Sequence, residues 1–344
     1  MRSLALVVIA RDEAPRIQRL LDSVRPFVDH MLVLDTGSTD DTVALARAAG
    51  ARVETSFTWC DDFAAARNHA LDLASADWHL VLDADEWLEQ GGETLAALRN
   101  ITPDFVGTIE LLDHFDGGVA HQTLSRLLPG SVRYAGRVHE QAQHALPLQR
   151  TALRVGHDGY SAERLAAKRG RNRPLLERMV AQGQGSDAYL LYQLGKDCAV
   201  YDEHEQAEEA FSKAVDAAAG TVQPSWWFDL VSRRLYALKR LGRHGEGVMF
   251  AEEQMAACAA SPDFFFALGD LLLDFAAEAP DRAAALLPMA EAAWRQCLEL
   301  GERTDQIGAV AGRGSKLAAH NLIILLTGTG RAAEASVIKD AYSL

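Results

Sequence analysis

Four short β-rich runs alternate with helical stretches over the first 110 residues, and this alternation constrains the fold more than any other feature of the sequence. The clearest runs, 4–10 and 78–83, carry apolar residues in succession rather than at every second position. Such strands, separated by helices, predict a mostly parallel α/β sheet that is covered on both faces. The other two strands are expected at 30–35 and 51–57.

Polar residues cluster directly after two of these runs. Asp35-Thr36-Gly37-Ser38 follows the second run, and Asp83-Ala84-Asp85-Glu86 follows the fourth. Ligands of open α/β sheets bind at the carboxyl ends of the strands. Two carboxylates two residues apart suit a hard divalent cation, which prefers oxygen ligands and recruits diphosphate oxygens. The alternative for Asp83-Ala84-Asp85 is a solvated turn or a helix N-cap.

Ala-rich helical stretches replace the strands from about residue 186 onward. With Ala188 at position 1 of a 34-residue tetratricopeptide frame, small and large apolar residues fall at the packing positions of the repeat. They are Leu191, Leu194, Gly195, Ala207, Phe211 and Ala214 at positions 4, 7, 8, 20, 24 and 27. Weaker copies of the pattern recur at 238–247, 264–275 and 325–335. The sequence therefore predicts a helical repeat region, with an unrelated helical bundle as the alternative.

These two patterns divide the chain into three parts. We expect an α/β domain at 1–160, a bridging basic helix at 161–185 and an all-α, tetratricopeptide-like domain at 186–344. Helical repeats form concave surfaces that hold peptides or mediate assembly. The last domain is therefore expected to bind a partner, and it can also supply a homodimer interface.

The charge balance disfavours one large class of partner. The 34 lysine and arginine residues against 48 aspartate and glutamate residues give a formal net charge of −14. Binding to duplex nucleic acid is not expected, because that affinity comes mostly from phosphate neutralisation. No apolar run approaches the roughly 18 residues that span a bilayer, so no stable membrane insertion is expected. The run at 4–10 lacks a cleavage pattern for a signal peptide, which favours a cytoplasmic, bacterial protein.

Four motifs occur in order within the first 90 residues, each near the end of an expected strand. They are ARDE (10–13), VLDTGSTDDT (33–42), WCDDFAAARN (59–68) and LDADE (82–86). In this succession the sequence resembles the family 2 glycosyltransferases of GT-A fold. The resemblance implies a Rossmann-like catalytic domain that uses a nucleotide-sugar and a divalent metal ion, Mn²⁺ or Mg²⁺. The departure is at ARDE, where the family pattern usually has Asn-Glu and this sequence has Asp12-Glu13.

The resemblance also implies roles for the motif residues. Asp35 would accept a hydrogen bond from the uracil imide, which favours UDP over GDP, and the alternative is a capping role in its own turn. Arg67, with Asn68 beside it, would bind the nucleotide or its diphosphate, against the alternative of a surface ion pair. Asp83 is expected near the ribose and Asp85 on the metal ion.

Further candidates lie between 131 and 173, where the same family branch is similar. A histidine from this part often completes the metal site, and His157 is favoured over His139, with a core or turn histidine as the alternative for each. A basic run that includes Lys168 and Arg171 is expected to close over the diphosphate leaving group. The alternative for this run is a solvated helix face.

The family resemblance implies a single inverting displacement at the anomeric carbon, in which a carboxylate removes the proton of the acceptor. Glu140 is the expected base because it lies beside a candidate metal histidine, and Asp113 and Asp116 are the reserves. A transferase followed by helical repeats resembles bacterial peptide S- and O-glycosyltransferases. This implies a Ser, Thr or Cys side chain of a peptide or protein as the acceptor.

Three other functions stay open on the sequence. The same domain can act on a small molecule, a glycan or a lipid carrier. A non-catalytic repeat scaffold is a second option, although it would have no need of Asp35, Arg67, Asp83 and Asp85 together. A nucleotidyltransferase is the third, but it would normally carry a Gly-rich phosphate loop after the first strand. ARDEAPR (10–16) lacks glycine.

Overall fold

The computed structural model divides into two compact units, which are described separately. It describes residues 1–115, 118–157, 170, 172–184 and 187–344. The first unit comprises Met1–Gly117 and Gln122–Ala166, and the second comprises Gly118–His121 and Ala167–Leu344. One strand, β7, therefore contributes residues to both units.

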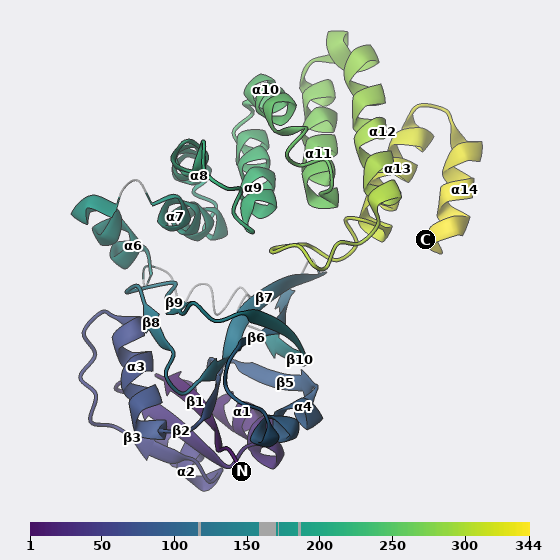
Figure 1. Cartoon of the computed structure of the whole chain (residues 1–344). Coiled ribbons are helices and arrows are strands. Elements are labelled where there is room, and N and C mark those ends of the chain that lie inside the picture. Colours follow the sequence, from purple (N-terminus) through teal and green to yellow (C-terminus); the bar gives the residue numbers. More distant parts are fainter. Residues whose placement is uncertain (116–117, 158–169, 171, 185–186) are drawn as a thin grey trace. The chain divides into compact units, whose positions relative to one another are not determined.

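The first unit is built on an eight-stranded sheet in the order β3-β2-β1-β4-β7-β6-β10-β5 (Figure 1). Strands β3, β2, β1 and β4 are parallel, as are β10 and β6, whereas β7 and β5 run antiparallel to β4 and β10. The strands are β1 (Leu4–Ala10), β2 (His30–Asp35), β3 (Arg52–Glu54), β4 (Trp78–Val81), β5 (Glu86–Gln90), β6 (Val106–Phe115), β7 (Gly118–Pro129) and β10 (Leu148–His157). A separate pair consists of β8 (Arg133–Ala135) and β9 (Gln141–Gln143). The prediction of a mostly parallel sheet is confirmed.

Helices cover both faces of this sheet. Successive side chains of a strand point to opposite faces, and in β1 the side chains on both faces are apolar. On β1, Leu4 and Leu6 pack with α1 in one core, whereas Ala5 and Val7 pack with α3 in another. The helices of this unit are α1 (Ile17–Val24), α2 (Thr42–Ala48), α3 (Phe63–Ala74) and α4 (Gly92–Ala97), with short 3₁₀ turns η1 (Arg25–Phe27) and η2 (Leu98–Asn100). This two-sided burial is what the unbroken apolar runs predict.

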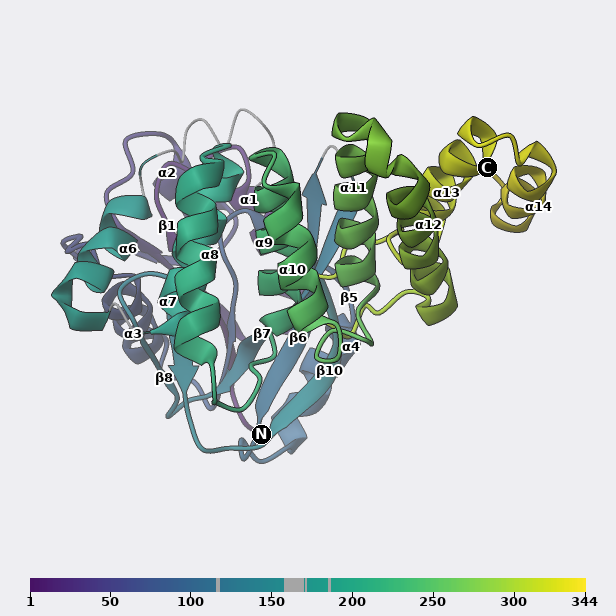
Figure 2. The same ribbon diagram turned by 90° about the horizontal axis from the view of Figure 1, so that it is seen from above.

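The second unit is helical, and Figure 2 shows α8, α9, α11 and α12 following one another side by side. Its helices are α6 (Arg173–Met179), α7 (Ala188–Val200), α8 (His204–Ala218), α9 (Trp227–Arg240), α10 (His244–Gln254), α11 (Pro262–Glu278), α12 (Ala283–Leu300), α13 (Lys316–Gly328) and α14 (Ala332–Tyr342). A π-helical turn, η3 (Val180–Gln184), follows α6, and a 3₁₀ turn, η4 (Pro280–Arg282), precedes α12. None of the described helices has both the length and the apolar character needed to cross a membrane.

Two glycines allow close helix packing in this unit. A Cβ at Gly195 of α7 would lie 2.4 Å from the ring of Phe211 on α8. The same arrangement recurs later in the chain, where a Cβ at Gly269 of α11 would lie 2.6 Å from the indole of Trp294 on α12. The tetratricopeptide frame places Gly195 and Phe211 at packing positions, and the structure brings them into contact.

The first residues of the strand β7 belong to the second unit. They pair antiparallel with the loop between α12 and α13, with an isolated bridge between Ala120 and Val310. The backbone N–H of His121 donates to the carbonyl of Ala309 at 2.9 Å, and the N–H of Ala311 donates to the carbonyl of Val119 at 3.0 Å. These bonds tie the loop to the start of β7.

We expect Gly195→Ala to lower the free energy of unfolding of the helical unit by about 1–3 kcal/mol, because overpacking a filled core has this cost. Phe211 is fully buried and has no room to withdraw. Gly245→Ala is the matched control, since a Cβ there meets nothing within 4 Å and is expected to be neutral or to stabilise α10 by up to about 1 kcal/mol. Urea melts followed by circular dichroism measure both changes. Equal midpoints for the two variants would contradict the packing argument.

Candidate functional site

Charged side chains gather at the carboxyl ends of β4, β6 and β10. Asp83 and Asp85 follow β4, and Glu86 is the first residue of β5. The strand register places His157, the last residue of β10, beside Asp113 of β6 and opposite Glu86. Carboxyl ends of parallel strands are where α/β sheets bind ligands. The pairing of strands distant in sequence therefore assembles this group.

Arg67 of α3 holds two carboxylates that are far apart in the sequence. Its Nη2 donates to Asp83 Oδ1 at 2.6 Å, and its Nε donates to Glu140. Its guanidinium carbon lies 5.5 Å from the centroid of the Tyr134 ring. Burial acts to lower the pKa of Arg67, but the charges of Asp83 and Glu140 raise this pKa well above its usual value. The side chain is a buried, fixed cation rather than a member of a surface ion pair.

One donor of Arg67 is left over. The Nη1 atom is buried and has no hydrogen-bond partner among the described residues. Buried polar groups are nearly always hydrogen-bonded, and an unsatisfied one costs about 1–3 kcal/mol or more when charged. This N–H group is therefore suited to donate a hydrogen bond to an oxygen atom of a ligand.

Arg126 of β7 is a site residue that the sequence analysis did not identify. Its Nη2 donates to Asp83 Oδ2 at 2.8 Å and to Glu86 Oε1 at 3.0 Å. Burial acts to raise the pKa of Asp83, but the charges of Arg126 and Arg67 hold this pKa well below its usual range. Burial raises the pKa of Glu86 to about 7, against the charge of Arg126. The available signal was a single arginine inside the apolar run LSRLLP (124–129), because a charge is rarely buried unless it is paired.

His157 and Asp113 form a hydrogen-bonded pair beside Asp85. The Nδ1 atom of His157 lies 2.6 Å from Asp113 Oδ1, and its Nε2 lies 3.4 Å from Asp85 Oδ2. Gln122 donates to the other oxygen of Asp113. Burial acts to lower the pKa of His157, but the hydrogen bonds to Asp113 and Asp85 raise it to about 10. Asp113, predicted as a reserve base, thus lies in the position of a residue that orients His157.

Asp85 and His157 have the chemistry of the metal ligands that the sequence predicts. Carboxylate oxygen and imidazole nitrogen both suit Mn²⁺, and neighbouring ligands about 2.1 Å from an octahedral ion lie about 3 Å apart. The 3.4 Å separation of Oδ2 and Nε2 is close to that value. A carboxylate on the other ring nitrogen is the usual support of a metal-binding histidine. Within the described part of the chain, no group of three His, Cys, Asp or Glu side chains is arranged to hold a metal ion, so His139 as a further ligand stays a prediction.

Asp35 and Asn68 are both hydrogen-bonded to the backbone. The Asp35 carboxylate, at the end of β2, accepts from the N–H groups of Gly37 and Ser38 at 3.1 Å. It orders the loop after β2, and its contact with a uracil stays a prediction. The Asn68 side chain donates to the carbonyl of Tyr134 at 2.9 Å and accepts from the N–H of the same residue at 2.8 Å. Both ends of this amide therefore tie α3 to β8.

The structure describes only some of the remaining candidates. Glu140, the expected base, is 9% exposed and accepts the hydrogen bond from Arg67. His139 is half-buried and adopts a left-handed backbone with φ of 52°. Arg173, at the end of the basic run, pairs with Glu177 at 2.8 Å in the second unit. The candidates Lys168, Arg171 and Asp116 lie outside the described residues.

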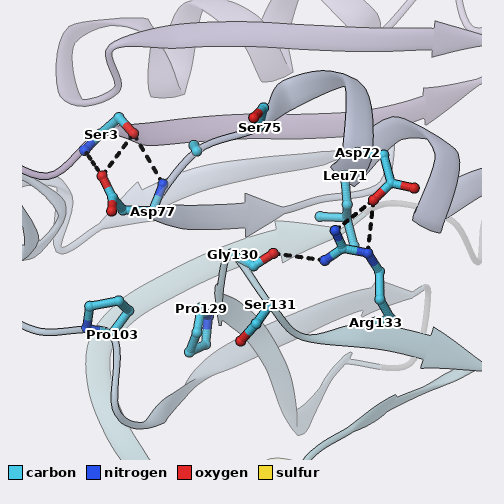
Figure 3. A pocket seen from close by; sticks show the side chains of 11 residues that line it. Ser3, Leu71, Asp72, Ser75, Asp77, Pro103, Pro129, Gly130, Ser131 and Arg133 are labelled. Carbon is cyan, nitrogen blue, oxygen red and sulfur yellow. Dashed lines mark hydrogen bonds and ion pairs between the residues drawn. The ribbon is translucent and has the colours of Figure 1, made fainter.

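A hollow of about 600 Å³ lies at the opposite edge of the sheet (Figure 3). It is lined by the residue before β1, the residue before β4 and the turn after β7. Its polar side chains bind one another: Asp77 accepts from the N–H and hydroxyl of Ser3, and Arg133 pairs with Asp72 at 2.6 Å. None of the site candidates predicted from the sequence lines this hollow.

The family comparison agrees with the location of the charged residues. Residues 5–109 match the family described as Glycosyl transferase family 2. This chain contains a family 2 glycosyltransferase domain. The family resemblance of the four motifs is thereby confirmed, as is the expectation of a GT-A catalytic domain followed by a helical region.

Relatives match the chain beyond this domain. A TPR repeat-containing protein of Synechococcus elongatus is 38% identical over 212 residues, which are 57% of this chain and 52% of that protein. The SPbeta prophage-derived glycosyltransferase SunS of Bacillus subtilis is 28% identical over 221 residues, which are 61% of this chain and 52% of that protein. The chain thus spans about half the length of these curated relatives.

Among solved structures, glucosyl-3-phosphoglycerate synthase from Mycobacterium tuberculosis, in complex with Mn²⁺, UDP and glucosyl-3-phosphoglycerate, has a TM-score of 0.28 and 26% identity. The match covers 33% of this chain and 44% of that chain. A TM-score at this level adds nothing to the assignment, which stands on the family match and the strand order.

Arg126→Met is expected to lower the free energy of unfolding of the first unit by about 3 kcal/mol, because the buried Glu86 carboxylate loses the cation that it contacts and Asp83 keeps only Arg67. Arg154→Met is the matched control on β10. Arg154 pairs with Glu110 at 3.1 Å but is 39% exposed, and surface pairs contribute about 0–1 kcal/mol. Urea midpoints of the two variants give the comparison. A loss no larger for Arg126 than for Arg154 would show that the buried network does not hold the site together.

Proposed function

We propose that this protein is a metal-dependent, inverting glycosyltransferase that moves a sugar from a UDP-sugar to a Ser, Thr or Cys side chain of a peptide or protein. The observation that carries the proposal is the pairing of Asp85 with His157 next to the cations Arg67 and Arg126, at the carboxyl edge of a family 2 glycosyltransferase domain. A pair of side chains able to ligate a metal ion, lying beside fixed cations, suits the binding of a metal-bound diphosphate.

In this proposal Asp85 and His157 hold Mn²⁺ or Mg²⁺. The ion, when bound, neutralises charge on the diphosphate as it leaves the sugar. Arg67 offers its buried Nη1 to an oxygen of the nucleotide, since that donor has no partner among the described residues. Asp35 selects uracil by accepting from its imide, because a base that cannot donate there leaves the carboxylate unpaired. Lys168 and Arg171 add positive charge over the diphosphate.

The reaction forms one bond and breaks one bond at the anomeric carbon. The oxygen or sulfur of the acceptor attacks that carbon, the bond from the carbon to the diphosphate oxygen breaks, and the configuration inverts. The acceptor's proton goes to the Glu140 carboxylate. A positioned general base typically accelerates such a reaction by about 10²- to 10⁴-fold. Arg67 donates to both Glu140 and Asp83. It would therefore hold the base in a fixed position relative to Asp83, the residue expected near the ribose of the donor.

The helical unit supports a peptide or protein as the acceptor. Its successive helices pack side by side, and tetratricopeptide-type packing recurs in it at Gly195 and Gly269. Stacked helical repeats provide extended surfaces that bind peptides. A relative at 38% identity is described as a TPR repeat-containing protein, which agrees with repeats in this half of the chain.

Titration calorimetry with UDP and GDP, with and without Mn²⁺, tests the donor site. We expect UDP to bind in the presence of Mn²⁺ and Asp85→Asn to weaken that binding by about tenfold or more, since one anionic metal ligand is lost. Asp22→Asn is the control, because Asp22 is exposed on α1 and pairs only locally with Arg25. A folded wild type that binds neither nucleotide would refute the enzymatic proposal and favour a repeat scaffold.

Turnover of a UDP-sugar with a peptide acceptor tests the base. Glu140→Gln is expected to lower kcat by about 10²-fold or more, because glutamine keeps the size of the side chain but accepts no proton. Glu54→Gln, in an exposed pair with Arg52, is expected to leave kcat unchanged. A loss of less than tenfold in Glu140→Gln would remove Glu140 as the base.

A further inference from the structure

Gln122 is the residue at which β7 passes from the second unit to the first. On one side of it, the backbone of His121 is hydrogen-bonded to Ala309 within the second unit. On the other side, Leu127 and Leu128 pair with β4 in the sheet of the first unit. Gln122 itself belongs to the first unit, as do Asp113 and His157.

The Gln122 side chain begins a line of contacts that ends at the metal position. Its Nε2 donates to Asp113 Oδ2. The other oxygen of Asp113 lies 2.6 Å from Nδ1 of His157, and Nε2 of His157 lies 3.4 Å from Asp85 Oδ2. Each of these four side chains comes from a different part of the chain, and none of the motifs in the sequence includes Gln122.

A buried carboxylate needs donors on both of its oxygens. Asp113 is 3% exposed, so solvent offers little replacement for a lost hydrogen bond, and an unsatisfied buried charge costs several kcal/mol. Without the amide of Gln122, Asp113 would rotate or draw in water, and its hydrogen bond to Nδ1 of His157 would change direction. Supports of this kind orient metal-binding histidines, and their loss typically costs 10- to 100-fold in metal affinity or activity.

We propose that Gln122 is a positioning residue that orients His157 through Asp113 and so tunes metal binding. Its relevance to the reaction rests on the proposed function, but its effect on His157 does not. Gln122 touches neither donor nor acceptor in this proposal. Its contribution is to keep Nε2 of His157 facing Asp85.

The test uses the full chain and three variants. Gln122→Leu keeps the bulk of the side chain and removes the donor, whereas Gln122→Lys restores a donor of similar reach. Gln149→Leu is the matched control, since Gln149 is an exposed glutamine on β10, the strand that carries His157. Two readouts are taken: the Mn²⁺ dissociation constant with saturating UDP, and the His157 Hε1 resonance of the metal-free protein, assigned by its loss in His157→Asn.

We expect Gln122→Leu to raise the Mn²⁺ dissociation constant about tenfold and to shift or broaden the His157 resonance. Gln122→Lys should stay within about threefold of the wild type, because it can donate to Asp113, and Gln149→Leu should change neither readout. An unchanged resonance and an unchanged Mn²⁺ affinity in Gln122→Leu would overturn the inference and leave the proposed function standing. A shifted resonance in a protein that binds no Mn²⁺ would support the positioning role and refute the proposed metal site.

Discussion

The ion pairs that the largely buried Arg67 and Arg126 form with Asp83 and Glu86 are the constraint on which the rest of the first unit depends. Charges taken out of water are stable only when they are paired and hydrogen-bonded. Arg67 and Arg126 both contact Asp83, and Arg126 also contacts Glu86. The network therefore requires α3, the end of β4, the start of β5 and β7 to meet at one place. In the proposed function, the same requirement places Arg67 and Arg126 beside the diphosphate.

One sequence motif serves three separate purposes within two turns of helix. In WCDDFAAARN (59–68), Asp62 caps α3 by accepting from the N–H of Ala65 at 2.8 Å, Arg67 faces the charged site, and Asn68 binds the backbone of β8. The motif thus begins the helix, supplies the cation and ties down the neighbouring hairpin. Asp62 and Asn68 thus hold in position the helix that carries Arg67.

Local and periodic signals were sufficient for much of the architecture. Unbroken apolar runs indicated the parallel strands, and acidic residues after them marked the carboxyl edge where Asp83 and Asp85 lie. The spacing of Gly195 and Phe211 indicated a repeat that the structure forms. Arg126, Gln122 and Trp294 were missed for a common reason. Each acts across a contact between distant segments, and the register of such a contact depends on strand or helix pairing that no local pattern encodes.

The division of β7 between the two units has an evolutionary consequence. Gly118–His121 complete the helical unit although they lie before the last strand of the sheet in the sequence. A gene fragment that began at the helices would lack these residues, and the backbone groups of Gly308, Ala309 and Ala311 would lose their partners. Backbone groups left unpaired in this way invite pairing with other chains. Exchange of the helical array between family members by a single recombination event is therefore disfavoured, and the array and the first residues of β7 are expected to be inherited together.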